Sequence, residues 1–453
     1  MKKKYEIDMS EGRLVPKLLA FIVPVMLSGV LQLAFNAADL VVVGRFAGEN
    51  ALAAVGSNGA LITLIVNVLM GMSTGTSVLV SNCFGAKDKE NLQSTIQTSV
   101  LIAFFGGILF AGIGYFLSGV LLSAMGTPED VLPLAELYLK IYFSGLPVIA
   151  LYNFTSAVLR AVGDSRRPLL FLAIAGVLNV ALNLFFVLVF HMDVAGVALA
   201  TVLSQCVSTF LTLRCLVRAD GIYHLELRHI RFSGRRFLRI LRIGLPAGIQ
   251  GSLYSVSNVL IQSSINSFGA VVMAGNSAAA SVESFAFVVQ DSVNQASVAS
   301  VSQNMGARKY KRVEQAVLCC ALLEIGLSLV AAGCMMLFRR FFLGIYTSDP
   351  EAVEAGCVRL MIMGAVYFTN GLQNMMGGVM RGHGYSLLPT AVTMTGICGI
   401  RILWLYTVFA AHHELQLVYL SYPVSWIITI TVQAICYFSI RKKAYAKNEA
   451  LYS

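Results

Sequence analysis

The sequence predicts an all-α polytopic membrane protein whose twelve transmembrane helices form two parallel six-helix repeats. Composition is the first of three observations that predict this class: 57% of the 453 residues are hydrophobic and 12% are charged, against roughly 25% charged residues in a soluble domain. The second is that apolar stretches long enough to cross about 30 Å of hydrocarbon recur about twelve times. The third is that several sequence blocks recur in the same order at nearly one spacing.

Long apolar stretches predict the individual spans. Residues 18–35, 99–117 and 169–190 each approach or exceed the roughly 18 to 20 apolar residues that a membrane helix needs. The first of these resembles the core of a signal peptide. However, acidic residues precede it and no clear cleavage site follows it. We therefore expect the first helix to be retained.

Basic residues predict the orientation. They cluster before the first helix and after the second, fourth, sixth, eighth and twelfth, and loops after odd-numbered helices contain few of them. Examples are Lys2, Lys3, Lys4, Lys87, Arg166, Arg228, Arg308 and Lys442. The positive-inside rule then predicts a multi-pass membrane protein with both termini in the cytoplasm.

Matching blocks predict the two halves. Gly85 in "NCFGAKDKEN" and Gly306 in "NMGARKYKR" are 221 residues apart, and "LRAVGDSRRP" and "MRGHGYSLLP" repeat Arg, Gly and Pro at the same offset. Pro24 and Pro246 are 222 residues apart. We expect an N-terminal lobe over 1–218, a cytoplasmic linker over 219–237 and a C-terminal lobe over 238–453. Parallel repeats of this kind are a transporter architecture with a substrate site at the repeat interface.

Polar side chains repeat at helical spacing on several predicted spans. Because such groups are costly against lipid, we expect them to line a wet cavity, with interhelical hydrogen bonding as the structural alternative. The candidates for the substrate cavity are Gln32, Asn36, Asn258, Gln262, Glu283, Gln290 and Asn374. Pro24 and Pro246 are candidate hinges, because an internal proline removes a helical hydrogen bond.

Acidic residues within the spans are candidates for ion coupling. Asp39 in "FNAADLVVVGRF" can take up a proton or Na⁺ in one conformation and release it in another, or it can fix a helix end at the interface. Glu283 is a second coupling site, a counter-charge for a cationic substrate, or the partner of Arg401, taken as the only arginine deep in a late helix. Glu324, isolated in "CCALLEIGLSLV", receives no role from the sequence.

The chain resembles bacterial members of the multidrug and toxic compound extrusion (MATE) family over nearly its whole length. The similar segments are "NAADLVVVGRFAGENALAAVG", "FGAKD", "SQNMGAR", "LRAVGDSRRP" and "MDVAGVALAT". The resemblance implies a MATE-like fold of the MOP superfamily in the bacterial inner (plasma) membrane, with two lobes that export organic cations in exchange for Na⁺ or H⁺. It also implies coupling-ion ligands at Asp39, Asn179 and Thr201.

The chain departs from the family pattern at two places. Asn183 stands in "NVALN" where many bacterial relatives have a second aspartate, and "LPAGIQGSLYS" lacks the seventh-helix glutamate of one branch. Asn183 joins the proposed coupling site as a neutral ligand, which leaves Asp39 as the single acidic candidate there.

Other functional classes fit less well. The basic residues form no stripe for nucleic acid. The chain has no P-loop, GxSxG or HExxH motif, which argues against an enzyme, and the loop typical of a major-facilitator transporter is absent. The nine cysteines have neither metal-ligand nor disulfide spacing. We expect a monomer in contact with membrane lipids, without a cofactor beyond the coupling ion. A flippase for a lipid-linked oligosaccharide, or another exporter of the same superfamily, is the remaining alternative.

Overall fold

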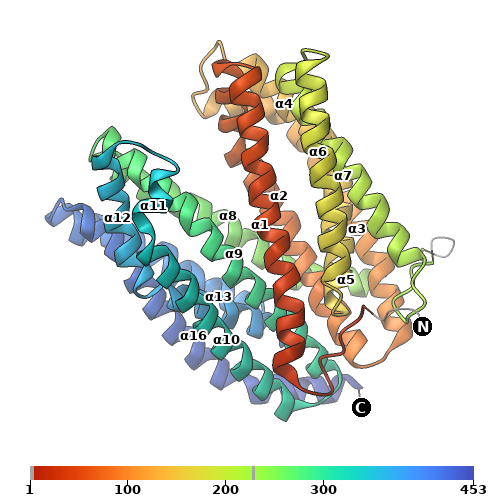
Figure 1. Ribbon diagram of the computed structural model, residues 1–453. Coiled ribbons are helices and arrows are strands. Elements are labelled where there is room, and N and C mark those ends of the chain that lie inside the picture. Colours follow the sequence, from red (N-terminus) through yellow and green to blue (C-terminus); the bar gives the residue numbers. More distant parts are fainter. Residues whose placement is uncertain (1–4, 227–229, 453) are drawn as a thin grey trace. The chain divides into compact units, whose positions relative to one another are not determined.

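The structure is a computed structural model that describes residues 5–226 and 230–452, and every regular element in those ranges is a helix (Figure 1). Lys2, Lys3, Lys4 and Arg228, used above for orientation, lie outside the described residues. The first half contains α1 (Leu14–Phe46), α2 (Glu49–Gly85), α3 (Lys89–Ala124), α4 (Leu132–Ser144), α5 (Leu146–Ala161), α6 (Arg166–Leu188) and α7 (Asp193–Val217). The second contains α8 (Gly234–Asn266), α9 (Ala270–Gly306), α10 (Tyr310–Leu337), α11 (Arg339–Gly344), α12 (Pro350–Gly364), α13 (Tyr367–Gly382), α14 (Leu387–Thr393), α15 (Ile400–Trp404) and α16 (Leu415–Tyr452), with π-helical turns at η2 (Met394–Gly399) and η3 (Leu405–Phe409).

Each predicted span corresponds to a long helix or a helix pair. Among the described residues, nine helices are long and apolar enough to cross a membrane, and two bent pairs raise the number to eleven. The pairs are α4 with α5, bent by 49°, and α12 with α13, bent by 54°. The remaining predicted span is α8, which is 33 residues long but rich in serine, asparagine and glutamine. The fourth and tenth predicted helices are therefore broken, a feature that apolar periodicity alone does not reveal.

The described helices repeat with the spacing found in the sequence. α2 and α9 are both 37 residues long, α5 and α13 are both 16, and each pair begins 221 residues apart. Lys87 and Arg308, in the middle of the loops after α2 and α9, share the same left-handed backbone conformation with φ of 56°. Two homologous halves explain this agreement, because unrelated segments would not place the same strained turn at the same register.

The helices cluster into two compact units that do not coincide with the sequence halves. Unit 1 contains Met1–Asp8 and Leu27–Gly248, and unit 2 contains Met9–Met26 and Ile249–Ser453. The beginning of α1 thus packs with the second half of the chain, and the beginning of α8 packs with the first half. Both changes of unit fall two residues after a helical proline, Pro24 in α1 and Pro246 in α8.

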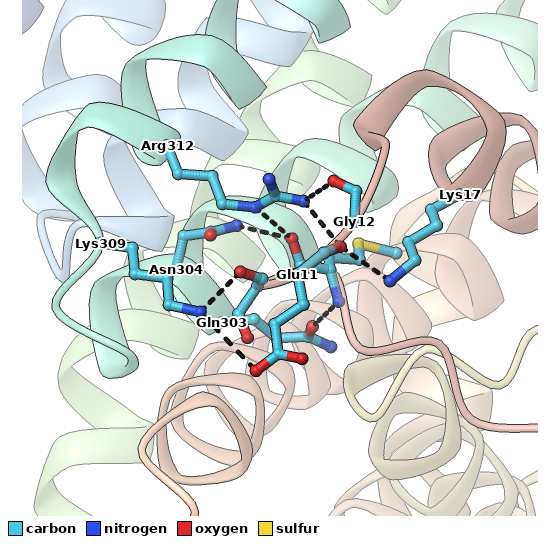
Figure 2. Close-up of polar contacts among 9 residues, drawn as sticks. Glu11, Gly12, Lys17, Gln303, Asn304, Lys309 and Arg312 are labelled. Atoms are coloured by element: carbon cyan, nitrogen blue, oxygen red, sulfur yellow. Dashed lines mark hydrogen bonds and ion pairs between the residues drawn. The ribbon is translucent and has the colours of Figure 1, made fainter.

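The segment before α1 docks within unit 2 on the end of α9 and the start of α10 (Figure 2). Arg312 donates hydrogen bonds to the backbone carbonyls of Met9, Glu11 and Gly12 at 3.0, 2.8 and 2.7 Å. The backbone N–H of Met9 donates to Oε1 of Gln303 at 2.8 Å. These contacts satisfy backbone groups of the irregular segment before α1 that have no partner in regular secondary structure.

The segment before α8 makes the corresponding contacts within unit 1. The backbone N–H groups of Arg231 and Ser233 donate to side chains of Gln97 and Thr98 on α3, both at 3.2 Å. The linker is therefore anchored on α3, as the N-terminal segment is anchored beside α10. In each half, the segment before the first long helix therefore packs within the unit that consists mainly of the other half.

Glycines bring α2 and α8 into backbone contact within unit 1. A Cβ atom on Gly71 would lie 2.1 Å from the backbone nitrogen of Gly248, and one on Gly75 would lie 2.4 Å from the carbonyl oxygen of Ile240. Small residues at a crossing let membrane helices approach closely and gain packing contacts. No side chain fits between these two helices at that point.

We predict that Gly71→Ala destabilises unit 1 because the added methyl group forces the two helix backbones apart. Overpacking of this kind costs about 1–3 kcal/mol. The measurement is the midpoint of thermal unfolding of the purified protein in detergent. Gly56→Ala is the matched control on the same helix, because a Cβ there meets nothing within 4 Å. Equal midpoints for the two variants would contradict the close crossing.

Large apolar side chains cover the outside of the helices. Phe116, Val330 and Leu337 are 81%, 72% and 79% exposed, which for a soluble protein would be an aggregation surface. Buried apolar residues form a core inside each unit, for example around Tyr419 and Leu360 in unit 2. Apolar residues on both the inside and the outside are what a helix bundle needs in lipid.

Candidate cation-binding site

Asp39 lies on α1 within unit 1, where it is half-buried against α6. The side-chain amide of Asn183 donates a hydrogen bond to Oδ1 of Asp39 at 2.5 Å. Asn183 is completely buried, so the amide is held on the carboxylate by the packing of α6. The structure therefore joins the first-helix acid to one of the asparagines predicted to act with it.

Asn179 and Thr201 extend this cluster. Asn179 is one helical turn before Asn183, which places both side chains on the same face of α6, and its Oδ1 accepts from Asn183 at 3.4 Å. The amide of Asn179 donates to Oγ1 of Thr201 on α7 at 3.4 Å, and that hydroxyl donates to the carbonyl of Val197. α6 and α7 are packed against each other in unit 1, so all four predicted coupling-ion residues meet at one place.

The cluster combines one carboxylate with several neutral oxygen atoms. Oδ1 of Asn183 is buried and has no hydrogen-bond partner among the described residues, although a buried amide oxygen is normally satisfied. Tyr138 on α4 interacts electrostatically with Asp39. One carboxylate with several neutral oxygens suits a hard monovalent cation, and the carboxylate alone suits a proton. The residues present thus fit either coupling ion.

Gln32 and Asn36 lie on α1 before Asp39, and their side chains are exposed. They share the helix stripe predicted from the sequence. The structure brings neither of them into a hydrogen bond with the Asp39 cluster. Their assignment to a substrate cavity stays a prediction.

Glu283 forms a buried ion pair in unit 2 with Arg359 on α12. Nε and Nη2 of Arg359 donate to Oε1 and Oε2 of Glu283 at 2.9 and 2.7 Å, the two-pronged geometry that guanidinium and carboxylate groups favour. Nη1 of Arg359 donates to Oδ1 of Asn276 at 2.5 Å, and Asn276 in turn donates to Gln262 at 2.9 Å. Glu283 and Gln262 therefore belong to one internal network.

Of the three alternatives for Glu283, the pairing with Arg401 is wrong. Arg401 instead donates to Oγ of Ser425 at 2.9 Å and lies over the ring of Tyr422 at 4.1 Å. The partner of Glu283 is Arg359, which was not predicted and is a lone arginine inside the apolar stretch "CVRLMIMG". A single arginine among apolar residues is the signal that could have found it, because a buried guanidinium needs a partner.

The other predicted cavity residues of unit 2 have different environments. Gln290 is buried, and its amide donates to the carbonyl of Tyr367 at 3.0 Å. Asn258 is exposed on α8, and Asn374 is half-buried on α13. Gln290 thus forms an internal hydrogen bond between α9 and α13, whereas Asn258 and Asn374 present accessible surface.

Two six-helix repeats with ionisable groups inside the spans define a polytopic membrane transporter. The MatE family model matches residues 24–185 and again residues 246–407, more than half of the chain. The "Probable multidrug resistance protein YpnP" of Bacillus subtilis (strain 168) is 31% identical over 386 residues, 84% of this chain and 85% of the relative. The chain therefore belongs to the MATE family of multidrug efflux transporters, which confirms the resemblance and fold class predicted from the sequence.

Two further comparisons agree. The "Probable multidrug resistance protein NorM" of Thermotoga maritima is 27% identical over 394 residues, 85% of this chain and 84% of the relative. A solved structure described as "Outward-facing conformation of a multidrug resistance MATE family transporter of the MOP superfamily" has the same fold, with a TM-score of 0.89 and 21% identity, over 99% of this chain and 100% of that one. The protein is thus a multi-pass membrane transporter rather than an enzyme.

Proposed function

We propose that the protein exports organic cations by antiport with Na⁺ or H⁺, and that Asp39, Asn179, Asn183 and Thr201 bind the coupling ion. The hydrogen bond from Asn183 to Asp39 is the observation that carries this proposal. It ties the acid of α1 to α6, so that a change in the charge of the carboxylate acts directly on the packing of the two helices. The names of the curated relatives, which describe probable multidrug resistance proteins, support small-molecule cargo.

The positions of Pro24 and Pro246 support a role as hinges in the transport cycle. Each of α1 and α8 changes its packing unit two residues after its proline. A proline lacks one backbone hydrogen bond, so a helix bends there at low cost. We infer that Pro24 and Pro246 are the hinges of an alternating-access cycle. In this cycle the lobes, residues 1–218 and 238–453, open in turn to the two sides of the inner membrane. Cytoplasmic termini and a monomeric state belong to the same proposal.

The test is uptake of ethidium into proteoliposomes under an imposed Na⁺ or H⁺ gradient. An ion gradient supplies about 2.3 kcal/mol per charge for each 100 mV, so a coupled transporter accumulates the dye only under the gradient of its own ion. Gradient-dependent accumulation is expected for one of the two ions. Its absence under both would contradict the cation antiporter and would favour the flippase or another exporter of the same superfamily.

A further inference from the structure

α10 contains a carboxylate that is buried without a cationic partner. Glu324 is 0% exposed, and its Oε1 accepts a hydrogen bond from Oγ of Ser328, one turn later, at 2.7 Å. Its other oxygen, Oε2, is buried and has no hydrogen-bond partner among the described residues. An ionised carboxylate without a cationic partner is strongly disfavoured when it is buried, so the group is neutral unless a cation reaches it.

Polar side chains from two other helices of unit 2 complete the cluster. The amide of Gln290 on α9 contacts Oγ of Ser328 at 3.3 Å, and the amide of Asn370 on α13 donates to Oε1 of Gln290 at 2.8 Å. Gly371 on α13 makes room for the acid, because a Cβ atom there would lie 1.8 Å from Oε1 of Glu324. Three helices thus enclose one acidic group.

The other half of the chain shows that the fold does not require these polar groups. At the 221-residue repeat spacing, Glu324, Gln290, Asn370 and Gly371 correspond to Ala103, Leu69, Ile149 and Ala150. All four counterparts are buried apolar residues of unit 1. The first half therefore fills the equivalent position with buried apolar side chains. Packing alone does not require an acid there, so Glu324 in the second half has another role.

The cluster lies beside a break in a membrane helix. α12 and α13 are bent by 54°, and Tyr367, the first residue after the break, accepts the hydrogen bond from Gln290. Discontinuous helices in transporters are places where binding sites form and where segments move. A displacement of α13 would move Gly371 and Asn370 away from Glu324 and open the acid to water.

The surroundings of Glu324 favour a proton as the ligand. The groups that interact electrostatically with Glu324 are Asp291 on α9, Tyr367 on α13 and Cys320 on α10 itself. Arg359 on α12 is occupied by Glu283, so it does not neutralise Glu324. Na⁺ needs several free oxygen ligands. Among the side-chain oxygen atoms of Glu324, Ser328 and Gln290, only Oε2 of Glu324 makes no hydrogen bond to the described residues. A proton needs only that atom.

We propose that Glu324 is a second proton-binding site, in the C-terminal half, which loads and releases one proton at Oε2 as α13 moves. The O–H bond forms with a proton taken from water on one side of the membrane and breaks to water on the other. Coupling of this proton to export rests on the proposed antiport, whereas its binding does not.

Infrared difference spectroscopy of the purified protein in detergent tests binding without transport. Titration with pH is expected to show the C=O stretch of a neutral carboxylic acid that is lost in Glu324→Gln and shifted in Ser328→Ala. Glu314→Gln is the control, because this glutamate is on the same helix but exposed and paired with Arg441. A spectrum that Glu324→Gln leaves unchanged, or an acid that does not titrate between pH 5 and 9, would overturn the proposal.

Proteoliposomes then test coupling. The measured quantity is the ratio of the ethidium concentration inside the proteoliposomes to that outside. Each coupled proton multiplies the attainable ratio about tenfold for each pH unit of gradient, because one pH unit is a tenfold difference in proton activity. Glu324→Gln is therefore expected to lower that ratio about tenfold at a gradient of one pH unit, with Asp39 intact. An unchanged ratio would make Glu324 a structural acid and end the proposal. Failure of the wild type to use a pH gradient would instead refute H⁺ antiport, and the infrared result would still decide whether Glu324 binds a proton.

Discussion

Asp39→Asn is expected to abolish gradient-driven export while leaving the protein folded. Asparagine has nearly the same shape and can still contact Asn183, but it can neither carry the charge that binds Na⁺ nor accept a proton. Uncoupling one charge removes about 2.3 kcal/mol of driving force per 100 mV, roughly a fiftyfold loss in the attainable concentration ratio. The measurement is ethidium accumulation in proteoliposomes under the gradient that drives the wild type.

Asp130→Asn is the matched control, because Asp130 is an exposed residue between α3 and α4. It undergoes the same chemical change and is expected to transport at the wild-type rate. Asn183→Leu is expected to weaken coupling without removing the acid, since it deletes the donor on Oδ1. Wild-type accumulation by Asp39→Asn would show that Asp39 only fixes the end of α1.

Arg359→Met is expected to cause the largest loss of stability in unit 2. Removing one partner of a buried ion pair leaves an uncompensated charge, which costs about 3–5 kcal/mol. Glu283 is 7% exposed, so solvent cannot replace the guanidinium. The expected result is a large drop in the midpoint of thermal unfolding in detergent, with partial recovery in the double variant Glu283→Gln, Arg359→Met, which has no orphaned charge.

Arg340→Met provides the control. Arg340 also pairs with a glutamate, Glu354, at 3.0 Å, but the two side chains are 73% and 63% exposed. An exposed pair contributes about 0–1 kcal/mol, so this variant should unfold near the wild-type midpoint. If Arg359→Met proved as stable as Arg340→Met, Glu283 would be free to act as a counter-charge for a cationic substrate.

The local sequence pattern was sufficient to predict the helices but not the points at which two of them are broken. The apolar stretches and the 221-residue spacing predicted the spans, because a membrane helix satisfies its own backbone and must be apolar over its length. The breaks at Gly145 and at residues 365–366 could not be predicted in the same way. Whether a helix bends there depends on the neighbours against which each part packs.

The candidate site was predictable to the same extent. Asp39, Asn179, Asn183 and Thr201 come from α1, α6 and α7, and the structure joins them by hydrogen bonds. The environment of Glu283 was not predictable, because a helix periodicity gives the face of a side chain but not its partner. Arg359, 76 residues later in the chain, is that partner.

By itself, the sequence determined the class of the protein, its repeat and its acidic candidates, since hydropathy, spacing and residue type are properties of the chain alone. Only the tertiary structure decided which charges are already neutralised and which are not. Glu283 meets an arginine, while Glu324 meets a serine and a glycine in a place that the first half fills with alanine and leucine. The physical reason is that the cost of a buried charge depends on the atoms around it, and folding brings those atoms from distant parts of the chain.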